Sequence, residues 1–524
     1  MPKIKLSKAT LILRNAQVLT MEMFRPRASL VAIKGDRISW VGSEADLDML
    51  VGPGTRTIDC QDKAITPGFF DAHLHLFSLA SARVSVDCSP ERVGSIADIK
   101  RAIQRKAAGL PAGAWVRAAG YNQFYLAEKR HPTRFDLDEA APAHPVKLMH
   151  RSGHVCVLNT LALQKADLLD RHPALAGQIE RDPQTSEPTG VLYEMEAYLS
   201  RALGYILSEA EVRDGLRQVG QRLLELGVTS VEDTTPINAL AQFETLQQMV
   251  ASGVRLPRIA KMFGADALPE LRRHGLMFGS DAGGVTIGAI KLMLDENSGR
   301  MFPPPDMVKA MALEAHQAGF QVAFHAMEEP DIAVSVEALH FALDQSPTMH
   351  HRHRLEHCAV CPPDLLAQVK RLMPVIVTQP GFVYQHGERY QATVPADQQP
   401  WLYQARAFLD GGLIVAAGSD APFGPEDPMK SLYGAVTRRT AVGTFLGPGE
   451  ALSVEEALAL HTSKAAYACF QEANRGSIAP GKLADLALLS GDPTAIPAES
   501  LKDLRVDLTV LGGQVVWDRR GMAT

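Results

Sequence analysis

The sequence predicts an α/β protein in which a (β/α)8 (TIM) barrel is joined to a composite β-sandwich built from both chain termini. Two observations predict the barrel. Short apolar segments alternate with amphipathic ones along most of the chain, which is typical of parallel β/α units. Histidines and an aspartate stand at the carboxyl ends of several apolar segments, where the functional residues of such barrels lie. A third observation, strand-like segments with glycine turns at both termini, predicts the sandwich.

The terminal segments have the pattern of short antiparallel strands. Those near the N-terminus flank a Lys34-Gly35-Asp36 turn, and those near the C-terminus flank a Gly512-Gly513 turn. Neither set has enough strands to bury both faces of a sheet by itself. We therefore expect residues 1–65 and 475–524 to form one composite β-sandwich domain. The strand-like segments are 11–13, 17–19, 30–33, 37–42, 483–489 and 508–517.

The first barrel strand is expected in residues 65–77, where a Pro67-Gly68 turn leads into an apolar run. Seven more strands complete a barrel that we place in residues 66–474, with intervening helices such as 305–318 and 363–371. Residues 78–225 are too long for a structureless loop, so we expect an ordered insertion that covers the mouth of the barrel. The other seven strands are 228–233, 258–263, 287–293, 321–325, 354–357, 374–379 and 413–420.

Composition narrows the class of protein. The 524 residues are 46% hydrophobic and 21% charged, which is ordinary for a globular protein. A net charge of −6 gives no general attraction for nucleic acid or for an acidic membrane surface, so we expect neither as a partner. No apolar stretch approaches the length that spans a bilayer, and the six cysteines are scattered, as in compartments where thiols stay reduced. We therefore expect a cytoplasmic protein.

The polar residues at the strand ends form a candidate metal site. His73 and His75 are two apart in an extended strand, so both imidazoles leave the same face and can bind one ion. Two ligands are too few, because catalytic zinc sites have three protein ligands. Other strand ends supply further ligands of suitable type. Together, the strand-end residues are His73, His75, Lys291, His325, His357 and Asp420.

Each of these residues has an ordinary structural explanation when it is taken alone. A strand histidine is usually a polar group with satisfied hydrogen bonds, and Asp420 could cap the helix that follows it. Lys291 could be a buried lysine paired with a carboxylate. Their joint placement at the ends of separate strands favours a metal centre, and imidazole suits zinc and similar ions.

Several motifs surround these residues. Three of them are Pro67-Gly68-Phe69-Phe70-Asp71-Ala72-His73-Leu74-His75, His353-Arg354-Leu355-Glu356-His357 and Gly418-Ser419-Asp420-Ala421-Pro422. Two more are Arg151-Ser152-Gly153-His154, leading to Val157-Leu158-Asn159, and Arg475-Gly476-Ser477-Ile478-Ala479-Pro480-Gly481-Lys482-Leu483-Ala484-Asp485. The set resembles the amidohydrolase superfamily, and most closely its amidohydrolase family 3 branch, which includes N-substituted formamide deformylases. The resemblance runs nearly from end to end.

The resemblance implies two divalent metal ions, most often Zn2+, and an N6-carboxylysine at Lys291 that bridges them. Asp420 would also act as the base that takes a proton from the metal-activated water, which leaves the attacking hydroxide, and it would then hand this proton to the leaving nitrogen. The resemblance places His154 as a donor to the oxyanion, with a surface or core histidine as the alternative. The implied ligands are His73, His75 and Asp420 for one ion, and His325 and His357 for the other.

Physical chemistry supports the assignment of Lys291 independently. The residue lies in the apolar strand 287–293, where burial disfavours the ammonium form. A neutral amine can take up carbon dioxide and become an anionic carbamate, which can bridge two cations. An ammonium group cannot do so.

The loops at the barrel mouth offer an apolar and aromatic lining that suits an uncharged substrate. The loops after the fourth and fifth strands, at 291–299 and 325–331, differ from the usual pattern of the resembling branch. Since mouth loops set specificity, these differences leave the substrate open. The residues that we expect to contact a substrate are Gln379, Met293, Met327, Phe382 and Phe423.

We therefore expect a metal-dependent hydrolase that cleaves a non-peptide C–N bond in a small molecule, a linear N-substituted amide with apolar or aromatic groups. Hydrolysis of a cyclic amide, a carbamate or a carboxylic ester at the same centre is one alternative. A non-catalytic barrel that serves as an interaction scaffold is another, and the intact ligand set argues against it. The sequence leaves the oligomeric state open, including a homo-oligomer.

Overall fold

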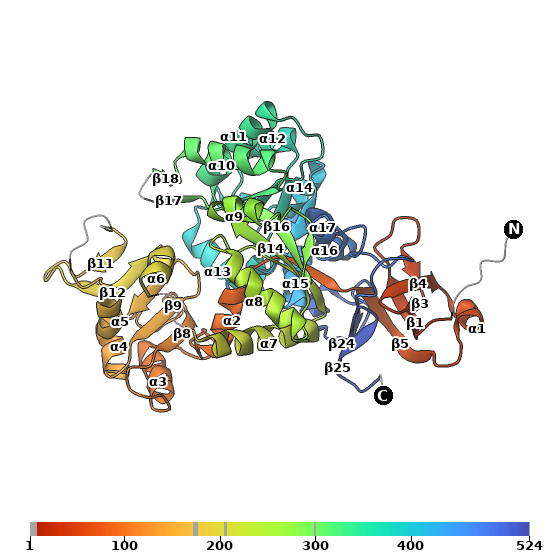
Figure 1. Cartoon of the computed structure of the whole chain (residues 1–524), viewed down its shortest axis with the longest axis horizontal. Helices are drawn as coiled ribbons and strands as arrows, with labels where there is room; N and C mark the ends of the chain where they lie inside the picture. Colours follow the sequence, from red (N-terminus) through yellow and green to blue (C-terminus); the bar gives the residue numbers. More distant parts are fainter. Residues whose placement is uncertain (1–7, 171–174, 176, 204–206, 298–299, 523–524) are drawn as a thin grey trace. The chain divides into compact units, whose positions relative to one another are not determined.

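The computed structural model describes residues 8–170, 175, 177–203, 207–297 and 300–522. Contacts divide the chain into two compact units, one of Met1–His75 with Gly220–Thr524 and one of Leu76–Val219 (Figure 1). The first unit contains the barrel and the sheet made by the termini, and the second is the insertion after the first barrel strand. Residues 298 and 299, in the loop predicted after the fourth strand, lie outside the described residues.

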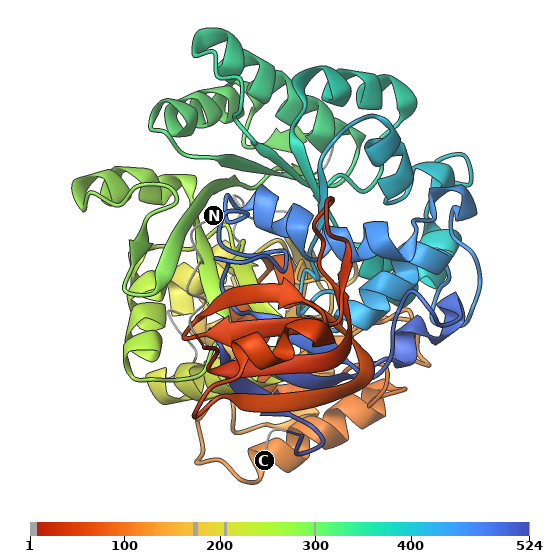
Figure 2. The same ribbon diagram turned by 90° about the vertical axis from the view of Figure 1, so that its right-hand side faces the viewer.

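Strands from both ends of the chain pair in one sheet, in the order β25-β24-β23-β5-β1-β3-β4, with β2 paired to β1. Figure 2 shows the N-terminal strands in red and the C-terminal strands in blue, side by side. Val18, Val31, Ile65, Leu488 and Val510 are buried together in its core. The predicted composite sandwich is confirmed. The strands are β1 Leu11–Leu19, β2 Arg27–Ala28, β3 Leu30–Lys34, β4 Arg37–Gly42, β5 Arg56–Pro67, β23 Leu486–Leu489, β24 Val506–Leu511 and β25 Gln514–Asp518.

Eight strands form the barrel sheet in the order β22-β21-β20-β19-β16-β14-β13-β6, and each is parallel to its neighbours. Short β15 (Asp281–Ala282) adds to β16. The predicted (β/α)8 barrel is therefore confirmed. The barrel strands are β6 Phe69–Leu74, β13 Val228–Asp233, β14 Arg258–Gly264, β16 Val285–Leu292, β19 Val322–Ala326, β20 Arg354–His357, β21 Val375–Thr378 and β22 Val415–Ala417.

The barrel closes between β6 and the chain that follows β22. The amide of Asp420 donates to the carbonyl of His73 at 2.7 Å, and the amide of His75 donates to the carbonyl of Ala421 at 2.9 Å. A Cβ atom at Gly418 would lie 2.4 Å from Cβ of His73, so only glycine permits this approach. The closure brings two segments that are distant in sequence, and that carry candidate ligands, to one seam.

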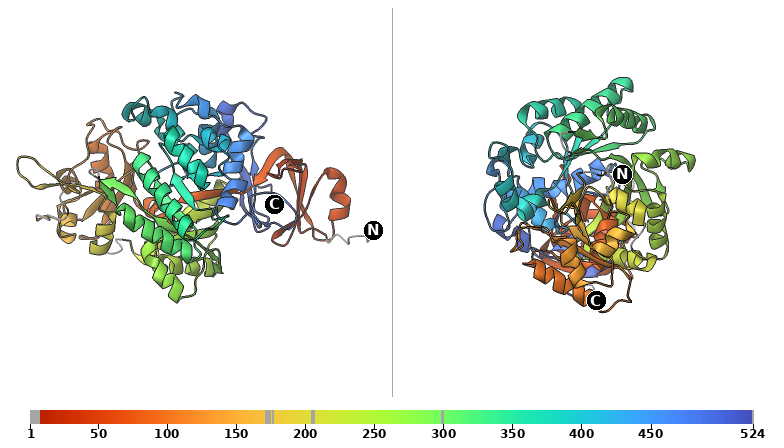
Figure 3. Two further views of the ribbon diagram at one scale, coloured as in Figure 1. Left: turned by 90° about the horizontal axis from the view of Figure 1, so that it is seen from above. Right: turned by 90° about the vertical axis from the view of Figure 1, so that its left-hand side faces the viewer.

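Helices α10, α11 and α12, green in the colour bar, lie on the outer side of the barrel strands in Figure 2 and Figure 3. Helices α10 and α12 agree with the predicted helices, and both begin with a proline, which needs no hydrogen-bond acceptor for its nitrogen in the first turn. The helices of this unit are α1 Leu47–Leu50, α8 Leu240–Ala251, α9 Leu268–Arg273, α10 Pro305–Gln317, α11 Glu329–Gln345, α12 Pro363–Leu372, α13 Pro380–Thr393, α14 Ala405–Asp410, α15 Pro428–Thr437, α16 Val454–Leu460 and α17 Ser463–Ala468. A hairpin of β17 Asp295–Asn297 and β18 Arg300–Phe302 follows β16.

The insertion has its own mixed sheet, in the order β11-β12-β10-β9-β8-β7, and its own buried apolar clusters. The long ordered insertion after the first barrel strand is confirmed, and its coverage of the barrel mouth stays a prediction. Its strands are β7 Val86–Asp87, β8 Val116–Tyr121, β9 Val146–His150, β10 Val155–Leu158, β11 Ile179–Arg181 and β12 Pro188–Tyr193. Its helices are α2 Leu76–Val84, α3 Ile96–Ala107, α4 Arg134–Ala140, α5 Thr160–Lys165 and α6 Glu196–Leu203, and α7 Glu209–Glu225 follows them. No helix in the described part of the chain is both long enough and apolar enough to cross a membrane.

Candidate metal centre

Three predicted ligands meet at the seam where the barrel closes. One ligand atom each from His73, His75 and Asp420 lies within 4.8 Å of the other two. Nε2 of His75 is 2.9 Å from Oδ1 of Asp420, and Nε2 of His73 is 3.4 Å from the same oxygen. The backbone of Asp420 has φ 56°, a left-handed conformation that a bulky residue rarely adopts. This backbone turn is fixed by the hydrogen bond of Asp420 to His73, so the closure also shapes the site.

The two other predicted histidines stand next to this triad. The ring of His357, at the end of β20, is 4.7 Å from the ring of His73 and 4.6 Å from the ring of His325, measured between centroids. His325 lies in β19, the neighbour of β20. The structure thus brings four of the predicted imidazoles and Asp420 into one cluster at the carboxyl ends of four strands.

Hydrogen bonds place the ring proton of three imidazoles on Nδ1. His73 donates Nδ1–H to Oε2 of Glu356 at 2.5 Å, and His357 donates Nδ1–H to Oε1 of Gln379 at 2.8 Å. His75 faces the hydroxyl of Thr235 at 3.1 Å. That hydroxyl donates to Asp233, so it accepts from His75. Each ring therefore presents the lone pair of Nε2, which is the form that binds a metal.

Lys291 lies in β16, and its side chain is buried. Burial lowers the pKa of Lys291 to about 8, although the nearby carboxylate of Glu356 acts in the opposite direction. Nζ has no hydrogen-bond partner among the described residues. In the described part of the chain the amine thus makes no hydrogen bond to a carboxylate, and its carboxylation stays a prediction.

The site holds buried polar atoms that a cation would satisfy. Nε2 of His73, Nζ of Lys291 and Oδ1 of Asp420 have no hydrogen-bond donor or acceptor as a partner within the described residues. Such orphaned groups are rare in proteins because an unpaired buried polar group is costly. Two imidazole nitrogens and a carboxylate oxygen are a ligand set that suits zinc or a similar divalent ion. The residues present therefore fit the implied metal.

The charges around Asp420 favour its ionised form. Burial alone would raise the pKa of Asp420, but the neighbouring imidazoles of His75 and His73 outweigh burial and hold the pKa below its usual value. Burial also lowers the pKa of His73 well below its ordinary value and that of His357 to about 4. At neutral pH the cluster thus combines the carboxylate of Asp420 with neutral imidazoles at His73 and His357, which are the protonation states of metal ligands.

The sequence did not reveal the buried charges behind these ligands. Glu356 binds Arg354 through both carboxylate oxygens, and Arg354 also binds Glu232. Asp233 pairs with Lys261 at 3.2 Å, and all five side chains are buried. The sequence did contain a signal for these buried ion pairs, namely charged residues inside apolar strands, because a charge is rarely buried without a partner. Their partners could not be named without the pairing of the strands.

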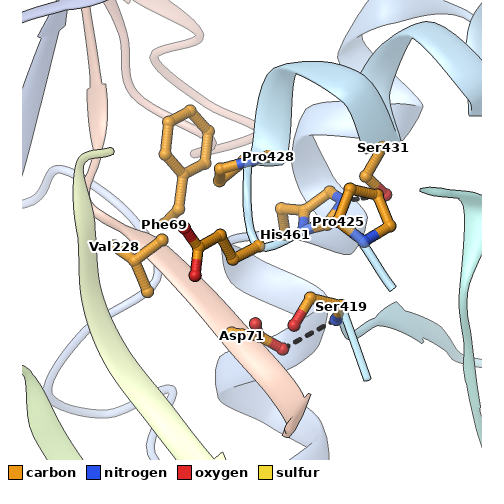
Figure 4. Close-up of a pocket in the computed structure, with 9 residues that line it drawn as sticks. Phe69, Asp71, Val228, Ser419, Pro425, Pro428, Ser431 and His461 are labelled. Carbon is orange, nitrogen blue, oxygen red and sulfur yellow. Dashed lines mark hydrogen bonds between the residues drawn. The ribbon is translucent and has the colours of Figure 1, made fainter. Parts of the chain in front are cut away.

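A small pocket lies on the same seam (Figure 4). It contains none of the candidate ligands. Asp71 lines the pocket and accepts the backbone N–H of Ser419 at 2.9 Å and that of His73 at 3.2 Å, so it ties β6 to the turn that carries Asp420. Burial raises the pKa of Asp71 to about 6. Asp71, the carboxylate of the first motif, is a further residue whose role the sequence interpretation missed.

The residues predicted to contact a substrate lie in different surroundings: some are near the candidate ligands, and others are buried in the apolar core or behind a ligand. Phe423 lies with its ring 5.2 Å from the ring of His75, and half-buried Met293 directly follows β16. Phe382 is buried in an apolar cluster against which Met327 packs. Gln379 is fully buried and binds His357, so its place in the structure is behind a ligand. Substrate contact by these residues stays a prediction.

His154 belongs to the insertion. Its Nδ1 lies 2.8 Å from a carboxylate oxygen of Glu194, and its side chain is 45% exposed. Its predicted role as a donor to the oxyanion also stays a prediction.

A barrel that gathers histidines and an aspartate at its strand ends is the architecture of a metal-dependent hydrolase. The sequence pattern of the amidohydrolase family matches residues 56–517, so the chain belongs to the amidohydrolase family. This confirms the resemblance found in the motifs. The protein is a hydrolase that acts on carbon–nitrogen bonds, and its triad fits a divalent metal ion.

Individual relatives cover nearly the whole chain. The N-substituted formamide deformylase of Arthrobacter pascens is 29% identical over 98% of this chain and 99% of its own length. The putative amidohydrolase YtcJ of Bacillus subtilis is 26% identical over 96% of this chain and 98% of its own. An uncharacterized metal-dependent hydrolase from Pyrococcus horikoshii shares the fold, with a TM-score of 0.75 at 22% identity over 93% of this chain and 99% of that one.

Proposed function

We propose that the protein hydrolyses a linear N-substituted amide with apolar or aromatic groups, and that it does so with two Zn2+ ions. The observation that carries the proposal is the cluster of buried, unpartnered ligand atoms on His73, Lys291 and Asp420. The amide class is supported by the end-to-end similarity to the N-substituted formamide deformylase. The metal supplies Lewis acidity, which makes a water molecule more acidic and polarises a carbonyl group.

The chain supplies the ligands and the base. His73, His75 and Asp420 would hold one ion, and His325 and His357 would hold the other. Lys291 would be a ligand of both ions as N6-carboxylysine, which its buried amine without a hydrogen-bond partner in the described residues favours.

Asp420 accepts a proton from the attacking water and returns it to the leaving nitrogen. In this reaction a C–O bond forms, the C–N bond breaks, and the proton moves from water to the amine. The lowered pKa of Asp420 keeps its carboxylate ionised at neutral pH, which is the form that can accept a proton. His154 is the proposed donor to the oxyanion.

The substrate class is tested with a panel scored by released amine, alcohol or acid. It contains N-alkyl and N-aryl formamides and acetamides, together with cyclic amides, carbamates and carboxylic esters. The proposal expects the linear amides to be cleaved fastest by zinc-loaded protein and expects no cleavage by chelator-treated protein. Faster cleavage of a cyclic amide, carbamate or ester would show that the proposed substrate class is wrong. If protein with full metal content cleaves no compound of the panel, the result would favour the non-catalytic scaffold.

A further inference from the structure

We propose that Glu356 and Thr235 are positioning residues, which fix the rings of His73 and His75 so that Nε2 of each faces the metal. The inference rests on the proposed metal chemistry of the site, but it concerns metal binding and not the substrate. Neither residue touches the ion or the substrate in this proposal. Each acts through the Nδ1 atom of one ligand.

The support behind His73 is ionic. Nδ1 of His73 donates to Oε2 of Glu356 at 2.5 Å. Nε and Nη2 of Arg354 bind the two oxygens of Glu356 at 2.6 and 3.0 Å. Arg354 also donates to Glu232 and, at 2.8 Å, to the carbonyl of Ala72 on the strand that carries His73. The guanidinium thus ties the carboxylate and the ligand strand together in one rigid fork.

The support behind His75 passes through a hydroxyl group. Nδ1 of His75 lies 3.1 Å from Oγ1 of Thr235, which donates to Oδ1 of Asp233 at 2.7 Å. The other oxygen of Asp233 is 3.2 Å from Nζ of buried Lys261. The direction of both hydrogen bonds is therefore fixed. Because the hydroxyl of Thr235 donates its proton to Asp233, its oxygen accepts the N–H of His75.

The two supports determine which nitrogen of each ring is free. With the proton on Nδ1, Nε2 of His75 and Oδ1 of Asp420 are two acceptors only 2.9 Å apart. Two lone pairs at this distance repel each other unless a cation lies between them. Zinc ligands stand about 2.0–2.2 Å from the ion in a tetrahedral arrangement, which places neighbouring ligand atoms about 3.3–3.6 Å apart, near the 2.9 and 3.4 Å that separate Oδ1 of Asp420 from Nε2 of His75 and of His73. The supports therefore hold the cluster in the form that an ion requires.

A purely structural role is the competing explanation, because Glu356 and Arg354 also join three barrel strands. Replacing Glu356 leaves Arg354 with less compensation, so a Glu356→Gln protein could lose metal through general loosening. Thr235 separates the two explanations. It is only half-buried, and Thr235→Val keeps its shape and its backbone bond to Asp233 while removing the acceptor for His75.

The experiment compares Thr235→Val, Thr235→Ser and Glu356→Gln with the natural chain and with Glu337→Gln, a control at an exposed ion pair. Competition with a chromogenic chelator gives the Co2+ affinity, and the visible spectrum of the Co2+-loaded protein reports ligand geometry. We expect Thr235→Val and Glu356→Gln to weaken Co2+ binding by about 10- to 100-fold and to change the spectrum. Thr235→Ser keeps a hydroxyl at this position, so its Co2+ affinity and spectrum should stay close to those of the natural chain. Glu337→Gln should change neither the affinity nor the spectrum.

Affinity and spectrum of Thr235→Val equal to those of the natural chain would overturn the inference, and so would a natural chain that binds no Co2+. If Glu356→Gln fails to fold, the comparison of Thr235→Val with Thr235→Ser decides between a positioning role and a purely structural one. These readouts require no turnover. A natural chain that binds Co2+ but cleaves none of the amides therefore refutes the proposed function while leaving the positioning roles intact.

Discussion

Acidification should destabilise the protein through His461, a buried histidine at the end of α16 that lines the pocket in Figure 4. Nε2 of His461 lies 2.8 Å from Oγ of Ser431, and its carbonyl accepts the N–H of Phe70 on β6. Burial lowers the pKa of His461 from 6.5 to about 4. A charged imidazole is therefore disfavoured at this place, next to the strand that carries His73.

The magnitude follows from the two pKa values. Because the folded protein takes up a proton less readily than the unfolded chain, the stabilising contribution is present above pH 6.5 and is lost as the pH falls from 6.5 toward 4. At a pH below both pKa values, this difference in pKa lowers the free energy of unfolding by about 3 kcal/mol. Between about pH 7 and about pH 5, linkage predicts that the free energy of unfolding falls by about 2 kcal/mol through His461 alone.

Urea unfolding of the natural chain and of His461→Gln across this pH range measures the effect. The stability difference between the two proteins should change by about 2 kcal/mol, with the variant relatively more stable at low pH. Asp71 lines the same pocket in both proteins, so its titration cancels to first order. His340→Gln, at an exposed histidine, is the matched control. A difference that does not depend on pH would refute the assignment of a buried, uncharged His461.

Three further predictions concern the site. Asp420→Asn should lower kcat by about 10²- to 10⁴-fold while the fold persists by circular dichroism, and near-normal kcat would refute its role as the base. Lys291→Ala should lose metal by elemental analysis and regain part of its activity with short carboxylic acids; retention of two ions per chain would show the lysine to be structural. Glu232→Gln should reduce the free energy of unfolding by about 3–5 kcal/mol, because it breaks a buried ion pair with Arg354, and a loss below about 1 kcal/mol would contradict that pairing.

Strand positions were predictable because local pattern determines them. The strands at Val228–Asp233 and Arg354–His357 have the bounds that the sequence predicts. The last barrel strand does not: residues 413–420 were expected, whereas β22 spans Val415–Ala417. The close approach of Gly418 to His73 ends the strand early, and that approach depends on the closed barrel rather than on the local sequence.

The candidate ligands were predictable because strand ends and residue types are visible in the sequence. Their supports were not, because they depend on contacts between distant strands. Glu356 is 283 residues from His73, and Thr235 is 160 residues from His75. Gln379 shows the same limit: its polarity suggested a substrate contact, and its hydrogen bond to His357 could not be foreseen from the sequence. The internal sheet of the insertion was likewise invisible to periodicity, since its strands are short and mixed in direction.

Anomalous X-ray scattering from crystals of the zinc-loaded protein tests the central claim most directly. The account predicts a zinc peak within bonding distance of Nε2 of His73, Nε2 of His75 and a carboxylate oxygen of Asp420, and a second peak beside His325, His357 and a carboxylated Lys291. No peak among these residues, or a peak bound elsewhere while the cluster keeps its present geometry, would contradict the account.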